Sequence, residues 1–272
     1  MELAVAINTH TRQTDCIRDT IDAISTYATN NILVLVDGCS WDHYKNLSLP
    51  AYKMEGFRHG CVKSPYKNVA LAIKTIAEKW QNCNWYCYCE YDVLFASDRF
   101  KYNLEKAEAM GVWMLGNDGH VDEQEIPLIS SMLGNNLRNS YYLLGCCQFF
   151  HRKFIEKLNE IDFFNRFLNL TSGFSDGFFP NYNGYDLSEH MYPSLCRHFG
   201  GNIGVFATWD QKKWHGAAEY FPVRWRPEID IEKDSYKNAS IIHPLKSFDN
   251  PIREYHRKKR EQWKILQKKE KQ

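Results

Sequence analysis

The stretch from residue 84 to residue 95 constrains the fold most strongly. Its sequence, NWYCYCEYDVLF, is apolar or aromatic at nearly every position until Glu90 and Asp92. A continuous apolar run of this kind is typical of a strand that is buried on both faces, as in a parallel α/β sheet. Because residues two apart in an extended strand point to the same side, we expect Glu90 and Asp92 to form a carboxylate pair near the C-terminal end of this strand.

A carboxylate pair at the end of a buried strand needs a partner, because an unpaired buried charge is very costly. Hard divalent cations such as Mg²⁺ and Mn²⁺ prefer oxygen ligands. Open α/β sheets also bind their ligands beyond the C-terminal ends of their strands. Glu90 and Asp92 therefore predict a Mn²⁺ or Mg²⁺ site. The alternative is that one of them caps the helix expected near residue 97, with Arg99 as its salt partner.

Strand and helix patterns alternate through the first 116 residues. The order strand, helix, strand at this spacing is typical of βαβ units with parallel strands. We expect an α/β fold with a mostly parallel central sheet flanked by helices. The strands are expected at 3–7, 32–36, 51–55 or 58–62, 84–95 and 112–115, and the helices at 15–27, 65–81 and 100–110.

The second half of the chain is less regular. A strand is expected at 141–150, helices at 151–161 and 187–198, and a last strand at 203–207. Residues 171–185 are rich in Gly, Asn and aromatic side chains and indicate either a binding loop or a surface loop. The simplest partition is one domain, with a regular first part (1–116) and a less regular second part (117–250), followed by a basic C-terminal helix (251–272).

Composition narrows the class of protein. The sequence has no apolar run close to the roughly 18–20 residues that span a bilayer, and its first residues read as a strand rather than a secretory signal. Its nine cysteines include no Cys-x-x-Cys pair, which favours buried free thiols and a cytoplasmic protein. Residues 253–272 hold nine Lys/Arg against three Glu, so the rest of the chain is acidic. Such a body offers no broad footprint for nucleic acid.

Several short motifs, taken in their order, resemble those of the GT-A glycosyltransferases that use nucleotide sugars, in particular family-2-like members. Residues 36–42, VDGCSWD, resemble the signature after the second strand, and 67–71, KNVAL, the start of the helix before the metal strand. Glu90-Tyr91-Asp92 stands where this family has Asp-x-Asp. Glu189-His190 with Arg197 is similar to the acidic motif on the acceptor side of inverting members, and residues 241–246, IIHPLK, to a late His and Lys of some members.

The resemblance implies a role for residues along the donor side of the site. Thr9 and Arg12, in the turn after the first strand, would meet base and phosphate, and Asp37 the base. The start of the helix at 65–81 brings in Asn68 as a further nucleotide contact. Asp92 would be the direct metal ligand, and Glu90 would bind the ribose, or the metal through water. On the same resemblance, residues 1–116 would be the nucleotide-sugar-binding half and residues 117–250 the acceptor-binding half of the domain.

The late segment and the acceptor side supply the remaining roles. His243 would complete the metal coordination as a neutral imidazole, and Lys246 would meet a phosphate as a point charge. An acceptor hydroxyl needs a base within hydrogen-bond reach, for which Glu189 is the first choice and Asp186 the second. Each residue also has an ordinary structural interpretation: Asp37 as a turn cap, Glu189 as an early-helix acid, His243 as a packed loop residue and Lys246 as a solvated lysine.

The implied activity is transfer of a sugar from a nucleotide-diphosphate donor to a hydroxyl of a saccharide or a lipid-linked acceptor. A sugar-phosphate nucleotidyltransferase is a second candidate, but it needs a glycine-rich basic loop after the first strand, and residues 8–12 contain no glycine. A third candidate is a catalytically silent protein that binds carbohydrate or nucleotide.

The basic tail allows two interpretations. Trp263 and Leu266 lie three residues apart, so they can share one helical face among mainly basic positions. A basic amphipathic helix suits an anionic membrane surface, which predicts peripheral membrane contact. The alternative is a solvated helix whose few apolar residues pack on the body.

Overall fold

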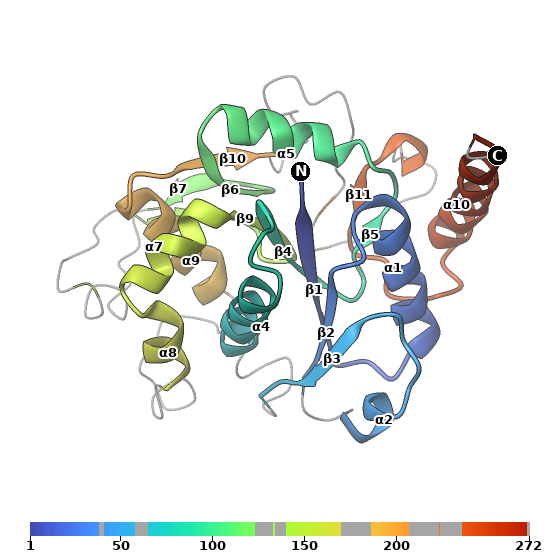
Figure 1. The fold of residues 1–272 in the computed structure, drawn as a ribbon, viewed down its shortest axis with the longest axis horizontal. Helices are drawn as coiled ribbons and strands as arrows, with labels where there is room; N and C mark the ends of the chain where they lie inside the picture. The colour runs from blue at the N-terminus through green and yellow to red at the C-terminus, as the bar shows by residue number, and fades with distance from the viewer. Residues whose placement is uncertain are drawn as a thin grey trace.

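The computed structural model describes residues 1–37, 41–57, 65–122, 133, 140–169, 186–206, 223 and 236–270. These residues form a seven-stranded sheet with helices on both faces (Figure 1). In order across the sheet, the strands are β10 (Asn202–Val205), β6 (Val112–Gly116), β9 (Cys147–His151), β4 (Trp85–Glu90), β1 (Leu3–Thr9), β2 (Ile32–Val36) and β3 (Tyr52–Glu55).

The sheet is mostly parallel, as the sequence predicts. The pairs β10–β6, β4–β1, β1–β2 and β2–β3 are parallel, and only β9 runs against its two neighbours, β4 and β6. The third strand takes the first of its two predicted positions, 52–55. The predicted α/β class, with a central sheet flanked by helices, is therefore confirmed.

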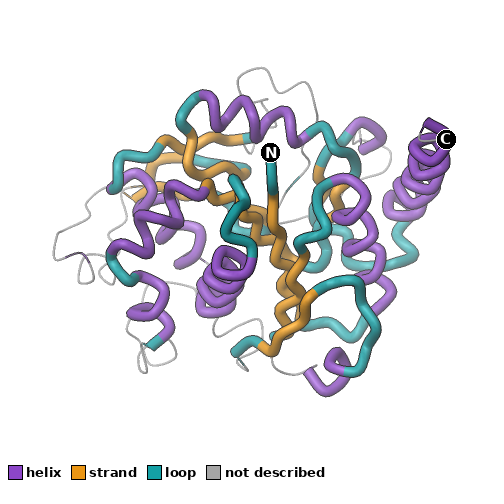
Figure 2. Tube along the Cα trace, viewed as in Figure 1, coloured by secondary structure: helices purple, strands orange, loops and turns teal. Residues whose placement is uncertain are grey.

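Alternation along the strands divides the core between the two faces of the sheet. In β1, Val5 and Ile7 face one hydrophobic cluster, whereas Ala4 and Ala6 face the other. Figure 2 shows the helices on either side of the strands. The first cluster contains residues of α1 (Thr14–Tyr27), α2 (Trp41–Lys45), α5 (Phe100–Ala109) and α10 (Pro251–Glu270). The second contains residues of α4 (Pro65–Lys79), α7 (Arg152–Glu160), α8 (Phe163–Leu168) and α9 (Asp186–His198).

The central strand ends earlier than the sequence predicts. Strand β4 stops at Glu90, and Val93 N–H donates to the Glu90 carbonyl (3.1 Å), which closes a turn. The following two residues form β5 (Leu94–Phe95), which pairs antiparallel with β11 (Ile241–Ile242). The prediction of one strand through residue 95 was wrong, because a turn and a remote partner interrupt the apolar run.

A second predicted strand is also divided. The run 141–150 forms β8 (Ser140–Tyr142), which pairs with β7 (His120–Asp122), and then β9 after the tight segment 143–146. The seven cysteines in the described part of the chain are buried and form no disulfide with one another, as predicted. The predicted loop at 171–185 lies outside the described residues.

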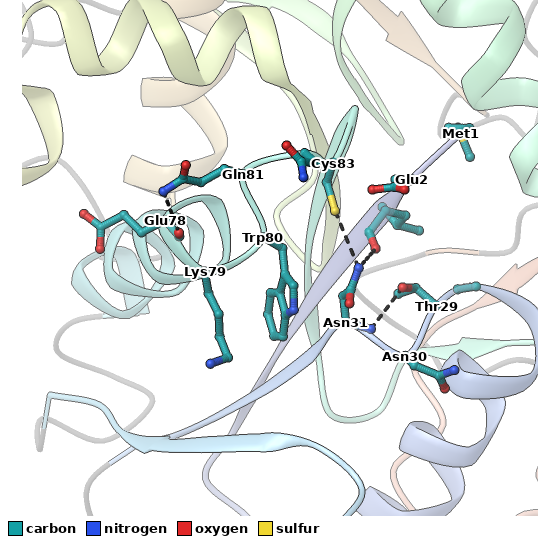
Figure 3. A pocket seen from close by; sticks show the side chains of 13 residues that line it. Met1, Glu2, Thr29, Asn30, Asn31, Glu78, Lys79, Trp80, Gln81 and Cys83 are labelled. Atoms are coloured by element: carbon teal, nitrogen blue, oxygen red, sulfur yellow. Dashed lines mark hydrogen bonds between the residues drawn. The ribbon is translucent and has the colours of Figure 1, made fainter.

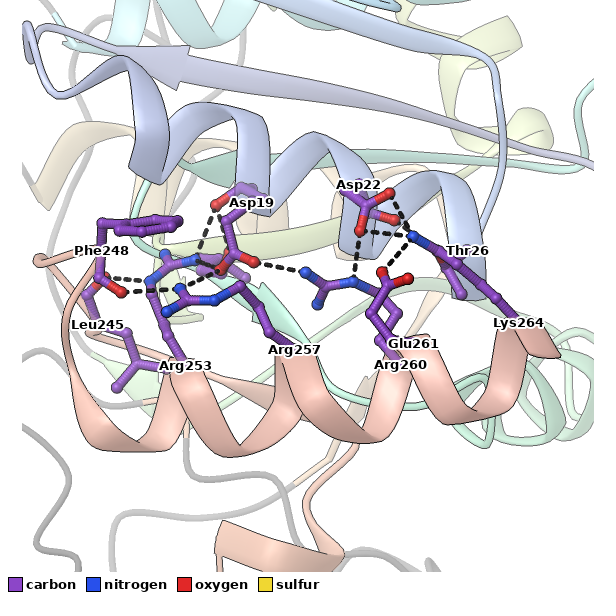
Figure 4. Close-up of polar contacts among 12 residues, drawn as sticks. Asp19, Asp22, Thr26, Leu245, Phe248, Arg253, Arg257, Arg260, Glu261 and Lys264 are labelled. Carbon is purple, nitrogen blue, oxygen red and sulfur yellow. Dashed lines mark hydrogen bonds and ion pairs between the residues drawn. The ribbon is translucent and has the colours of Figure 1, made fainter. Parts of the chain in front are cut away.

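The basic C-terminal helix α10 lies along α1 and is joined to it by ion pairs (Figure 4). Arg253 Nη1 donates to Asp19 Oδ2 (2.9 Å), and Arg260 Nε donates to Asp22 Oδ2 (2.6 Å). The side chains of Arg253, Arg260 and Asp19 are all buried. Buried charges of this kind are tolerated only when they are paired and hydrogen-bonded. Trp263, one of the predicted membrane-facing residues, instead contacts Tyr27 of α1 at 5.5 Å between ring centroids.

Candidate functional site

The C-terminal ends of β1, β2 and β4 meet at one edge of the sheet. Thr9 is the last residue of β1, Asp37 follows β2, and Glu90 is the last residue of β4. Asp37 N–H donates to the Thr9 carbonyl at 2.8 Å, and Asn8 lies opposite Glu90 in the β1–β4 register. Three residues predicted as nucleotide contacts are thus brought to the edge where open α/β sheets bind ligands.

His243 comes to this edge from the far end of the sequence. Its Nε2 lies 3.5 Å from Glu90 Oε2 and 3.3 Å from Asp92 Oδ1. The pairing of β11 with β5 and a hydrogen bond from Leu245 N–H to the Asp92 carbonyl (2.9 Å) hold the two segments together. His243 therefore lies beside both of the predicted carboxylate ligands, although Asp92 lies in a turn rather than in the strand.

Cys146 belongs to the same group of side chains, and the sequence did not reveal it. Glu90, Cys146 and His243 each place one donor atom within 4.8 Å of the other two. The antiparallel pairing of β4 with β9 brings Cys146 there, since its carbonyl accepts a hydrogen bond from Glu90 N–H (3.0 Å). Cys146 lies in an apolar run and was interpreted as a buried structural cysteine. Only the strand pairing, which the local sequence does not encode, distinguishes it.

The electrostatics of the group suit a cation. Burial by itself would raise the pKa of Asp92, but the hydrogen bond and charge of His243 hold that pKa below its ordinary value, with a smaller contribution from Lys246. Burial opposes protonation of His243, yet Cys146, Asp92 and Glu90 raise its pKa well above the usual range. A protonated His243 thus balances the charge of the neighbouring carboxylates. Carboxylate, imidazole and thiol are also donor types that divalent transition-metal ions bind.

One side of the group is open to solvent. The side chain of Glu90 is 41% exposed, whereas those of Asp92 and His243 are 3% exposed. Lys246 and Arg12, the two predicted phosphate contacts, are exposed. The influence of Lys246 on the pKa of Asp92 places its charge near the site. A ligand can therefore approach from the Glu90 side, and the charge of Lys246 lies near Asp92.

Asn68 has a structural task in this protein. Its Oδ1 accepts a hydrogen bond from Phe57 N–H (2.8 Å), and its Nδ2 donates to the Phe57 carbonyl (3.4 Å). A Cβ at Gly56 would lie 2.6 Å from the same Oδ1, so the chain after β3 needs a glycine there to pass Asn68. These contacts account for the burial of Asn68, and its predicted contact with nucleotide stays a prediction.

Glu189 lies against the segment that carries Cys146. Gly145 N–H donates to Glu189 Oε1 at 2.6 Å, and Leu143 N–H donates to the Glu189 carbonyl at 2.9 Å. Burial and the nearby Glu189 carboxylate raise the pKa of Tyr142. The carboxylate of Glu189, the first-choice base, is therefore hydrogen-bonded to Gly145, the residue that immediately precedes Cys146. The second choice, Asp186, is the first residue of α9, and its side chain lies outside the described residues.

A surface hollow of about 710 Å³ lies at the opposite edge of the sheet (Figure 3). Its lining includes Glu2 and Leu3 at the start of β1, Asn31 before β2, and Trp80 after α4. Asn31 Nδ2 donates to the Leu3 carbonyl (3.4 Å) and to Cys83 Sγ (3.7 Å). None of the residues predicted from the sequence lines this hollow, so the candidate site is the edge formed by the C-terminal strand ends.

Comparison with known proteins finds similarity only at the level of structure. No family model and no curated protein matches the sequence. A glycosyltransferase involved in the glycosylation of the major capsid of PBCV-1 is similar in structure, with a TM-score of 0.47 and 12% identity over 94% of this chain and 99% of that chain. The glycosyltransferase GlyE of Streptococcus pneumoniae has a TM-score of 0.40 and 10% identity, over 75% of this chain and 44% of that chain.

The structure is similar, with a comparable TM-score, to an enzyme of another kind. The 4-diphosphocytidyl-2C-methyl-D-erythritol synthase of Anaerococcus prevotii has a TM-score of 0.40 and 9% identity, over 78% of this chain and 89% of that chain. Because these TM-scores are all below 0.5, the activity has to be argued from the site itself.

Proposed function

We propose that the chain is a metal-assisted glycosyltransferase, which moves a sugar from a nucleotide-diphosphate donor to a hydroxyl acceptor. One observation carries the proposal: His243 joins Glu90 and Asp92 beside the ends of β1 and β2. A cation-binding group of this kind, open on the side of Glu90, suits a diphosphate. When bound, a divalent cation such as Mn²⁺ or Mg²⁺ neutralises the charge that develops on the leaving diphosphate.

The chain's own residues divide the remaining work. Thr9 and Asp37, at adjacent strand ends, are proposed to orient the nucleoside, with Asn68 as a further contact. Lys246 and Arg12 are exposed cations on the approach to the site and are proposed to bind phosphate oxygens as the donor docks.

Glu189 is proposed to accept the proton of the acceptor hydroxyl, and Asp186 is the second candidate. The Gly145 N–H bond to Glu189 Oε1 fixes the carboxylate beside the Cys146 segment, and a base has to lie within hydrogen-bond reach of the acceptor hydroxyl. One base that acts opposite the leaving group suits direct displacement, with inversion at the anomeric carbon.

Calorimetry with UDP and GDP tests the proposed donor site. We expect binding in Mn²⁺ to be at least tenfold tighter than in chelator, because Glu90 and Asp92 otherwise repel the diphosphate. His243→Asn should remove most of this difference. Equal affinity with and without metal would contradict a metal role. Incubation with a panel of nucleotide sugars then separates the candidate functions, since a binding protein releases no nucleoside diphosphate.

Membrane contact by α10 is a further part of the proposal, for a lipid-linked acceptor. Among the described helices none is both long and apolar enough to cross a bilayer. Two apolar side chains on α10, Ile265 and Leu266, are 55% and 57% exposed and precede Lys268 and Lys269. Wild type is expected to co-sediment with anionic vesicles at low salt, and Ile265→Ser/Leu266→Ser to stay in the supernatant. Equal, negligible binding of both proteins would remove the membrane contact.

A further inference from the structure

The candidate metal site contains a thiol, which separates it from a site built of oxygen and nitrogen donors alone. Cys146 is 4% exposed, and its Sγ lies within 4.8 Å of a Glu90 carboxylate oxygen and of a His243 ring nitrogen. A buried thiol next to an imidazole and a carboxylate needs an explanation beyond core packing.

The neighbouring cysteine shows what core packing alone looks like. Cys147 lies in β9, and its Sγ is 3.9 Å from Cys87 Sγ within the hydrophobic cluster on one face of the sheet. Cys146 belongs to the same cluster, but it precedes the strand, and its Sγ also lies near donor atoms of His243 and Glu90. Of these two adjacent buried cysteines, Cys146 is therefore the one that lies beside groups able to bind a cation.

The spacing of the donor atoms suits a small, tetrahedrally coordinated ion. Bonds of about 2.0 Å to nitrogen or oxygen and about 2.3 Å to sulfur place neighbouring ligands roughly 3.3–3.6 Å apart. The distances from His243 Nε2 to Glu90 Oε2 and Asp92 Oδ1 are 3.5 and 3.3 Å. Glu90, Cys146 and His243 are the three residues whose donor atoms all lie within 4.8 Å of one another, and the solvent-exposed side next to Glu90 stays available to a phosphate oxygen.

We propose that Cys146 coordinates the cation as a thiolate and that the site therefore prefers a borderline metal ion, Zn²⁺ or Co²⁺, to Mg²⁺. The inference rests on the metal site of the proposed function and names the class of ion that it takes. On binding, the thiol proton leaves to solvent and a metal–sulfur bond forms, so one positive charge is released as two enter. Soft sulfur donors favour such ions, whereas Mg²⁺ requires oxygen ligands and keeps its water.

Cobalt titration of the full chain in the presence of UDP tests the thiolate directly. Wild type should develop a thiolate-to-cobalt charge-transfer absorption in the near ultraviolet. Cys146→Ser should lose this absorption and bind Co²⁺ and Zn²⁺ at least tenfold more weakly, with little change toward Mg²⁺. Cys147→Ser is the matched control, because it removes an equally buried adjacent thiol, and it should keep both the absorption and the affinity.

X-ray absorption spectroscopy of the zinc-loaded wild type is a second test, and its result does not depend on whether a variant folds. A sulfur scatterer at about 2.3 Å is expected, beside nitrogen and oxygen scatterers at about 2.0–2.1 Å. A shell of nitrogen and oxygen alone, or a charge-transfer absorption that survives in Cys146→Ser, would overturn the thiolate while leaving the metal site in place. Failure of wild type to bind any of these ions would instead refute the metal-assisted function itself.

Discussion

Glu90 and Asp92 are two residues apart, but they have different surroundings. Asp92 is buried against His243, whereas Glu90 is exposed on one side and lies close to Cys146 as well. The turn that closes at Val93 produces this difference, since in a continuous strand both side chains would share one environment. Glu90 is therefore the carboxylate placed to meet both the proposed cation and an entering ligand.

Glu189→Gln should lower turnover about 10²–10⁴-fold while donor affinity is kept. Glutamine retains an oxygen that accepts the Gly145 N–H, so the local structure is preserved, but it cannot take a proton at neutral pH. Turnover with a nucleotide sugar and calorimetric donor affinity, measured on the same preparation, separate the two effects. Asp186→Asn is the control and should stay active. If it is the inactive variant instead, the base is Asp186.

Helix α10 also contacts the two segments that carry Glu90, Asp92 and His243. Arg253 Nε donates to the Leu245 carbonyl (2.9 Å), and its Nη2 donates to the Tyr91 carbonyl (3.4 Å). Tyr91 lies between the two carboxylates, and Leu245 follows His243 by two residues. One buried guanidinium, anchored on Asp19, thus links both segments that carry the donor group.

Arg253→Lys should weaken metal-dependent UDP binding by about tenfold, because an ammonium cannot reach both carbonyls and Asp19 at once. The matched control is Arg260→Lys, since Arg260 is equally buried and also pairs with Asp19. Its side chain donates to Asp19 and Asp22 rather than to the carbonyls of Tyr91 and Leu245. Metal affinity and the free energy of unfolding are measured for both variants. Equal losses of metal affinity in the two would assign Arg253 a purely structural role.

The stability of the whole molecule should depend on pH through His256 of α10. This side chain is fully buried, and its Nε2 lies 3.0 Å from the Tyr236 carbonyl. Burial lowers the pKa of His256 to about 4, with contributions from Lys259 and Arg260. Between that value and the ordinary pKa of about 6.5, the unfolded chain binds more protons than the folded one, so stability falls as pH falls.

His256→Gln tests this dependence, since glutamine keeps a donor for the Tyr236 carbonyl and does not titrate. Urea unfolding of both proteins from pH 7 to pH 4 gives their difference in free energy of unfolding. Relative to the variant, wild type should lose up to about 1.4 kcal/mol per pH unit below pH 6.5. A difference that does not change with pH would show that His256 titrates alike in both states.

The sequence by itself determined the class of fold and the edge where chemistry is expected. Apolar runs such as 32–36 and alternating helical patterns are local, and they follow from which side chains must leave water. The ends of those runs place Thr9, Asp37 and Glu90 at strand termini, so these positions could be predicted without any pairing information.

Only the tertiary structure decided which of these groups meet. A local pattern indicates that Cys146 or Arg253 is buried or charged, but not against what. Cys146 reaches Glu90 through the β4–β9 pairing, and Arg253 reaches Asp19 across 234 positions of sequence. The end of β4 at Glu90 likewise depends on β11, which pairs with the two residues that the apolar run had assigned to the same strand. Contacts between distant segments are selected by the packing of the whole chain, and for that reason the thiol in the site and the link from α10 had no local signal.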